Sequence, residues 1–316
     1  MGYRKIIYSG INGPLGHALG QLTKSDERFI PFSSEECDLR DANSTRTYFV
    51  NAIDRINPSE VAYLHLAARS GGVRFSALQP ATAFVDNMQM AINALKVCEE
   101  IGIKRILLTL STSCYSENLE MPSEAQLHEG SIDSSDFSYA YAKRMQEVLM
   151  RSFNKEFGMQ ISSVLVNGII GPKMSFNQEN SILPASLIRD FAKEVKSTKV
   201  IDVVFDPDVR REYTYSMDLA KILLWCLAKQ ESNSLLNIGS TEAVSVREIA
   251  HCVSNSLGIP QSRINYIEKK SSGRLVQSTS NEKFLIQNAF QYTHFSYAIK
   301  EAVDWYLIHQ TKSLSK

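Results

Sequence analysis

Short apolar runs of strand length alternate with longer stretches of helical periodicity through the first half of the chain. Polar or glycine-rich segments separate each run from the periodic stretch that follows. This alternation predicts a parallel sheet with helices on both faces. We therefore expect an α/β fold with a Rossmann-type doubly wound parallel sheet. Its strands are expected at Ile6–Tyr8, Phe29–Phe32, Val61–Leu66, Arg105–Leu110 and Ile161–Val166, and its helices from His17 and near 44–56, 81–101 and 139–157.

The regular alternation ends at Gly171 and Pro172, a pair that interrupts helices and strands alike. Beyond this pair the elements are less regular, with helices expected near 183–194, 217–229, 246–257 and 297–307. The segment 266–279, rich in Lys and Ser, is expected to be a loop. The chain is expected to divide into a larger, Rossmann-type part of residues 1–170 plus about 212–242 and a smaller mixed α/β lobe of about 171–211 plus 243–316.

Length and charge narrow the class of protein. The 316 residues are 44% hydrophobic and 22% charged, as in ordinary globular proteins. Because 34 basic residues balance 34 acidic ones, no net field favours nucleic acid or an anionic membrane as a partner. No apolar stretch approaches 18 residues and the N-terminus enters a strand at once, so a cytoplasmic protein is expected. Five scattered cysteines predict neither a disulfide framework nor a metal site.

A glycine turn stands between the first expected strand and helix. Gly10, Gly13 and Gly16 make a G-x-x-G-x-x-G motif in the segment Ser9–Gly16. Glycine permits a tight turn and close approach of the backbone, which leaves amide groups and the helix dipole directed at a pyrophosphate. The position of the motif between strand and helix favours a dinucleotide site.

Tyr139 and Lys143 form the second chemical motif, in the run Phe137–Lys143. Residues four apart lie on the same face of a helix, so the ammonium group is expected beside the phenol. A positive neighbour favours the phenolate and lowers the pKa of the phenol. A tyrosine tuned in this way can donate a proton to a developing alkoxide, as a carbonyl reductase requires.

Three further stretches, at His65–Gly72, Ser111–Cys114 and Arg210–Ala220, occur in order with these two motifs. Together the five motifs resemble the extended short-chain dehydrogenase/reductase family, and within it the GDP-L-fucose synthase group. The resemblance covers about residues 4 to 310. It implies an NAD(P)-binding Rossmann domain and a nucleotide-sugar-binding lobe. It also implies a homodimer formed through the helices near 81–101 and 139–157.

The resemblance implies a reductase that uses NADP(H), with NAD(H) also possible, on a GDP-linked 4-keto sugar. Ser111, Tyr139 and Lys143 match the family's catalytic residues: the serine would orient the carbonyl, the tyrosine would protonate the oxygen, and the lysine would hold the nicotinamide ribose. The cofactor would contact Gly10, Asn12, Gly13, Leu15, Gly16, Ser33, Asp38, Leu39, Ala67, Ala68, Asn87, Tyr139 and Lys143. The substrate would contact Ser113, Cys114, Ser181, Arg189, Arg211 and Arg274.

The chain departs from the group at the two residues that invert C3 and C5 of the sugar. The group's base is a cysteine two residues after the catalytic serine, and here an ungapped alignment puts Ser113 in that place and displaces Cys114 by one. The group's histidine is replaced by Ser181, whose hydroxyl has no pKa near neutrality. We therefore expect a C4 reductase without epimerase activity. Two alternatives remain: a full epimerase/reductase that uses Cys114, and a non-catalytic NAD(P)-binding regulatory protein.

Specificity is affected by further departures. The arginines with which the group binds NADPH are replaced by Asn12 in the glycine turn and by the run Phe32–Ser34 after the second strand. No acidic residue ends that strand to bind an NAD ribose either, since Glu35 comes late. Arg274 is expected to compensate for Gln277, which replaces a lysine. Gly168 replaces the asparagine of the group's Asn-x-Tyr-Gly-Pro motif. The smaller residue is expected to leave room for a heptose as well as a hexose.

Overall fold

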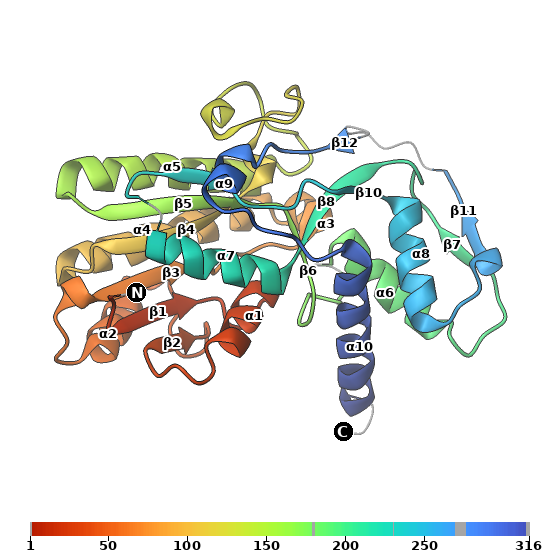
Figure 1. Ribbon diagram of the computed structural model, residues 1–316, viewed down its shortest axis with the longest axis horizontal. Helices are drawn as coiled ribbons and strands as arrows, with labels where there is room; N and C mark the ends of the chain where they lie inside the picture. Colours follow the sequence, from red (N-terminus) through yellow and green to blue (C-terminus); the bar gives the residue numbers. More distant parts are fainter. Residues whose placement is uncertain (1, 179–180, 230, 269–275, 314–316) are drawn as a thin grey trace.

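A central parallel sheet organises the first part of the molecule (Figure 1). The computed structural model describes residues 2–178, 181–229, 231–268 and 276–313. Its six-stranded sheet has the order β2-β1-β3-β4-β5-β9. This confirms the Rossmann-type sheet predicted from the alternating pattern. The strands are β1 (Lys5–Ser9), β2 (Phe29–Phe32), β3 (Val61–His65), β4 (Arg105–Ser111), β5 (Gln160–Val166) and β9 (Leu235–Asn237).

Helices cover both faces of this sheet, which explains why its strands are almost wholly apolar. On one face α1 (Pro14–Leu22) and α7 (Ser216–Lys229) pack against Ile6, Tyr8 and their neighbours in adjacent strands. On the other face Ile7 and its neighbours pack against α2 (Ala42–Ile53), α4 (Pro80–Ile101) and α5 (Phe137–Phe157). Successive strand residues therefore enter opposite halves of the core.

A smaller sheet and a group of helices form the remainder. Strand β8 (Arg210–Tyr215) pairs with three short strands, and a two-stranded sheet lies apart from them. The helices α6, α8 and α10 surround a separate apolar core that includes Ile188, Phe191 and Ile249. The elements are β6 (Gly168–Ile170), β10 (Ala243–Ser245) and β12 (Val276–Gln277) beside β8, the pair β7 (Ile201–Val203) and β11 (Ile264–Tyr266), and α6 (Leu183–Lys193), α8 (Val246–Leu257) and α10 (Phe295–Ser313).

Local signals fix several helix ends. Helix α2 begins earlier than expected because the Asp41 side chain accepts hydrogen bonds from the amides of Asn43 and Ser44 and caps the helix. Helices α4 and α5 end at Gly102 and Gly158, both in the left-handed conformation that favours glycine. Two short helices, α3 (Gly72–Leu78) and α9 (Glu282–Gln287), were not expected from the sequence pattern.

The described residues bear on three sequence-based expectations. No helix among them combines the length and apolar character needed to cross a membrane. Within the same residues no three His, Cys, Asp or Glu side chains are grouped so that they could hold a metal ion. All five cysteines are free thiols. Arg274, in the expected loop, lies outside the described residues.

Candidate active site

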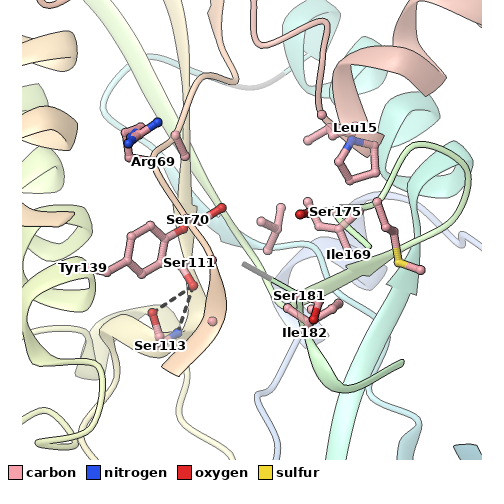
Figure 2. A pocket seen from close by; sticks show the side chains of 18 of the residues that line it. Leu15, Arg69, Ser70, Ser111, Ser113, Tyr139, Ile169, Ser175, Ser181 and Ile182 are labelled. Atoms are coloured by element: carbon pink, nitrogen blue, oxygen red, sulfur yellow. Dashed lines mark hydrogen bonds between the residues drawn. The ribbon is translucent and has the colours of Figure 1, made fainter. Parts of the chain in front are cut away.

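A cleft of about 1680 Å³ opens where the parallel strands end. The turns that follow β1, β2, β3, β4 and β5 supply one side of it, and residues of the β6–α6 segment and of β8 supply the other. Ligands of doubly wound sheets bind at this carboxyl edge. In Figure 2, Ser111, Ser113 and Tyr139 lie on one wall, and Ser181 and Ile182 lie across from them.

The glycine turn lines this cleft and is too tightly packed for side chains at two positions. A Cβ on Gly16 would lie 2.2 Å from the carbonyl oxygen of Gly10, and Gly10 itself has a φ of +80°. Ser9 fixes the turn against the end of β3, because its hydroxyl accepts hydrogen bonds from the amides of Leu66 and Ala67 at 3.1 Å each. The close backbone approach leaves the start of α1 open to the cleft, which fits the pyrophosphate of a dinucleotide.

The expected cofactor residues are brought together with one exception. Gly10, Asn12, Gly13, Leu15, Gly16, Ser33, Asp38, Leu39, Ala67 and Ala68 all line the cleft. Asn87 is fully buried and does not line it. Its side chain accepts a hydrogen bond from the Arg69 amide at 3.1 Å and donates one to the Arg69 carbonyl at 2.9 Å. Asn87 thus shapes the turn after β3 from a buried position behind the cleft lining.

Two arginines beside the expected adenosine position were missed in the sequence. Arg40 donates to Asp38 at 2.8 Å and to Asp86 at 3.2 Å, and Arg69 lies 3.5 Å from Asp86. Hydrogen bonds from Arg40 lower the pKa of the Asp38 carboxyl. Both arginines line the cleft. Arg40 directly follows the predicted pair Asp38 and Leu39, which was the signal that could have identified it.

Ser111 and Tyr139 meet as their motifs predict. Ser111 ends β4, and its hydroxyl accepts hydrogen bonds from the Ser113 hydroxyl at 2.9 Å and the Ser113 amide at 3.2 Å. Tyr139 lies in the first turn of α5, on the same wall of the cleft as Ser111 (Figure 2), and the Ser111 hydroxyl lowers the pKa of the phenol against the larger effect of burial. A substrate carbonyl between these two hydroxyls would meet two potential hydrogen-bond donors.

Lys143 differs from the expectation that it depresses the pKa of Tyr139. Its side chain is 1% exposed, and its ammonium group donates to the carbonyl of Thr109 at 2.9 Å. Burial lowers the pKa of Lys143 to about 8. Burial, followed by the charge of Asp136, raises the pKa of Tyr139. The spacing correctly indicates a shared helix face, but desolvation outweighs the neighbouring charge in setting the tyrosine.

Cys114 does not reach the cleft, in contrast to Ser113. Residues Thr112–Cys114 form one 3₁₀ turn that directs the thiol towards α5, where Sγ lies 3.5 Å from the Ala140 carbonyl oxygen. Cys114 is 0% exposed, and burial raises the pKa of its thiol to about 12. The expectation that Cys114 contacts substrate is therefore corrected: the hydroxyl of Ser113 occupies the cleft instead.

The expected substrate arginines have different positions. Arg211 lines the cleft, as does Ser181. Arg189 does not: its guanidinium group bonds to the Asp190 carboxylate at 2.8 Å, the Asn177 carbonyl at 3.1 Å and the Ser181 hydroxyl at 3.3 Å. Arg189 thus stabilises the segment that carries Ser181, because its donors are used within the protein.

Asp136 and Lys173 also line the cleft and were not singled out in the sequence. Asp136 precedes α5 as its N-cap residue, yet its carboxylate makes no cap hydrogen bond and accepts one from the Ser76 hydroxyl of α3. Burial raises the pKa of this carboxyl to about 6. Its position three residues before Tyr139 was the available signal, although an acidic residue there is typical of a simple helix cap.

Comparisons with known proteins identify a family and several similar proteins. A model of the NAD dependent epimerase/dehydratase family matches residues 9–239. GDP-L-fucose synthase from Dictyostelium discoideum is 28% identical over 313 residues, covering 96% of this chain and 95% of that protein. GDP-L-colitose synthase from Yersinia pseudotuberculosis is 27% identical over 262 residues, covering 80% and 82%. The structure of a GDP-L-fucose synthetase from Naegleria fowleri bound to NADP has a TM-score of 0.89 at 28% identity, covering 98% and 95%.

Proposed function

Because this chain belongs to the NAD dependent epimerase/dehydratase family, we propose that it reduces the 4-keto group of a GDP-linked 4-keto-6-deoxy sugar without inverting C3 or C5. Its membership confirms the family expected from the sequence and makes it an oxidoreductase of the nicotinamide-dependent type. The names of its relatives support a GDP-sugar, since those proteins are synthases of GDP-L-fucose and GDP-L-colitose. The sugar is a hexose or a heptose.

A nicotinamide dinucleotide held in the cleft would supply the hydride for the carbonyl carbon, and NADPH is the favoured form because a similar solved structure binds NADP. Gly10, Gly13 and Gly16 hold its pyrophosphate against the start of α1. Asp38 and Leu39 flank the adenine, and Ala67 and Ala68 line the channel that the cofactor occupies. The close packing of the glycine turn supports this placement, because a Cβ at Gly16 would collide with the Gly10 carbonyl.

Three residues of the protein contribute to the reduction. Ser111 orients the sugar carbonyl with its hydroxyl, and Tyr139 donates a proton to the oxygen as negative charge develops there. Lys143 holds the nicotinamide ribose from the buried face of α5. The observation that carries the proposal is that Ser111, Tyr139 and Lys143 line one cleft together with the glycine turn.

The loss of epimerase chemistry is supported by the groups that replace the family's base and acid. Ser113 and Ser181 present hydroxyls to the cleft, and neither has a pKa near neutrality. The alternative reaction with Cys114 as the base is not favoured, because burial raises the pKa of its thiol to about 12 and its Sγ faces α5. A non-catalytic regulatory role is not favoured, since the reductase residues are intact.

The second lobe is proposed to hold the GDP moiety, and the division of the chain at about residues 170, 211 and 242 is proposed with it. Arg211 would contact the diphosphate with its planar donors. Phe205 lines the same cleft with 46% of its surface exposed, which suits contact with a nucleobase. Arg189 acts through the segment of Ser181 and not by contact.

The reduction is tested by the fall in NADPH absorbance with GDP-4-keto-6-deoxymannose, a panel of GDP-4-keto heptoses following. We expect turnover by the natural chain and a loss of at least 100-fold in kcat for Tyr139→Phe, because general acid catalysis contributes on the order of 10² to 10⁴. Tyr141→Phe, two residues away on the same helix, is the matched control and should retain turnover. Equal rates for the natural chain and Tyr139→Phe would contradict the assigned role.

The absence of epimerisation is tested by turnover in heavy water. We expect the product to carry no deuterium at C3 or C5, because Ser113 and Ser181, which replace the family's base and acid, have no pKa near neutrality. Deuterium at either carbon would overturn this part of the proposal. Repeating the measurement with Asp136→Asn would then determine whether the Asp136 carboxyl is responsible.

A further inference from the structure

The glycine turn contains no basic residue of its own. Residues 9–16 include no Lys, Arg or His, and Pro14, the first residue of α1, has no N–H to offer a phosphate. His17, which follows the turn, does not supply a full positive charge, because burial and then the charge of Lys173 lower the pKa of its imidazole. A diphosphate placed here would rely on the remaining amides and the helix dipole unless a cation reached the turn from elsewhere.

Lys173 reaches this turn from a segment far away in the sequence. Its ammonium group donates to the side-chain oxygen of Asn12 at 3.3 Å, and both residues line the cleft. Lys173 lies between β6 and α6, and β6 pairs with β8 of the second sheet. The contact therefore joins the part of the chain proposed to hold the sugar nucleotide to the part proposed to hold the dinucleotide.

The backbone that presents Lys173 is held in an uncommon conformation. Lys173 has a φ of 65°, in the left-handed region that side chains other than glycine rarely occupy. Gly171 packs closely on the first residue of α7, since a Cβ there would lie 2.4 Å from the hydroxyl oxygen of Ser216. Outliers of this kind persist where surrounding structure determines them, and they are frequent at ligand sites.

We propose that Lys173 binds the diphosphate of the dinucleotide and thereby ties the β6–α6 segment to the glycine turn. The inference rests on the proposed function and adds to it a phosphate-binding residue delivered from the opposite wall. A lysine ammonium suits this task as a point charge. The diphosphate is favoured over a ribose 2′-phosphate because Asn12 belongs to the turn at the start of α1, whereas Ser33, Asp38 and Leu39 mark the adenosine end after β2.

The test is calorimetric titration of the full chain with NADPH and with NADH, which share the diphosphate but not the 2′-phosphate. Lys173→Met removes the charge and keeps much of the side-chain stem, and Lys173→Arg restores a cation. Lys24→Met is the matched control, because Lys24 is an exposed lysine just beyond α1 that does not line the cleft. Melting temperatures equal to that of the natural chain establish that each variant folds.

For Lys173→Met we expect the Kd for NADPH and the Kd for NADH to rise by the same factor of about ten, the size of one charge-assisted hydrogen bond. Lys173→Arg should recover most of the affinity, and Lys24→Met should leave both constants unchanged. Unchanged constants in Lys173→Met overturn the inference while leaving the proposed function intact. A loss confined to NADPH also overturns it, since it would indicate the 2′-phosphate. Failure of the natural chain to bind either dinucleotide overturns both proposals.

Discussion

Asp136 brings a second titrating group close to the reductase residues. Its carboxyl has a pKa raised to about 6 by burial, and its charge contributes to the raised pKa of Tyr139. Tyr139 must be protonated to donate, so activity is expected to fall as pH rises through the pKa of the phenol. A negative charge at Asp136 moves that loss of activity to higher pH.

Replacing Asp136 by Asn is therefore expected to shift the alkaline limb of the kcat/KM profile to lower pH. The pKa of Asp136 is raised in the folded state, so the stability that this group contributes is lost as pH rises from about 3.8 to about 6. The difference in stability between the natural chain and Asp136→Asn should therefore change with pH across this interval in denaturant titrations. Asp133→Asn, a neighbouring cleft carboxylate, is the control and should keep the alkaline limb in place. An unshifted limb in Asp136→Asn contradicts the coupling to Tyr139.

At this scale the sequence predicts identities better than energies. The spacing of Tyr139 and Lys143 was a weak signal alone, and the resemblance of five motifs to a family was needed to select these residues and Ser111, which all line the cleft. The pKa of Tyr139 was predicted in the wrong direction, because desolvation depends on tertiary packing that no spacing reports. Whether a side chain faces the cleft, as Ser113 does, or is buried against α5, as Cys114 is, depends in the same way on a single 3₁₀ turn.

At the scale of elements, the five parallel strands β1 to β5 were predictable because runs buried on both faces are almost wholly apolar, whereas the three-residue strand β9 was not predicted. The second sheet was not, since β6, β10 and β12 have three residues or fewer and show no usable period. Helix α3 was missed because it starts at Gly72, in a pair of glycines typical of a loop. The hydroxyl of Ser76, a residue of α3, nevertheless donates a hydrogen bond to the Asp136 carboxylate.

The turn between β1 and α1 offers a test of how strictly this element is packed. Gly16→Ala would place a Cβ 2.2 Å from the Gly10 carbonyl oxygen, whereas a Cβ on Gly13 meets the same atom at an ordinary 3.6 Å. Gly16→Ala is expected to lower the free energy of unfolding by about 1–3 kcal/mol through overpacking. Gly13→Ala should lower it by less than about 1 kcal/mol, the loss expected at a helix N-cap. Chemical denaturation compares them, and equal stability of the two variants would contradict the packing argument.

At the scale of the whole molecule, the cleft is built from segments that the sequence separates widely. Asn12 and Lys173 are in contact although one follows β1 and the other follows β6. Alternation of strands and helices predicts that turns meet at one edge of a sheet, which is why the glycine turn and Ser111 could be placed together. It does not predict which part of the second sheet faces that edge, so Lys173 emerged only from the three-dimensional structure.

Association of the whole chain is the last expectation open to test. Helices α4 and α5 pack side by side on one face of the central sheet and expose Phe84, Val85 and Val148. Exposed apolar side chains on paired helices are typical of a subunit interface, so we expect a homodimer.

Light scattering should give twice the 35.5 kDa mass of one chain. Val85→Glu combined with Val148→Glu should yield monomers, because burying two unpaired carboxylates is unfavourable. Val200→Glu, at a residue 60% exposed beyond α6, should leave the dimer intact. A monomeric natural chain at micromolar concentration would contradict this interface.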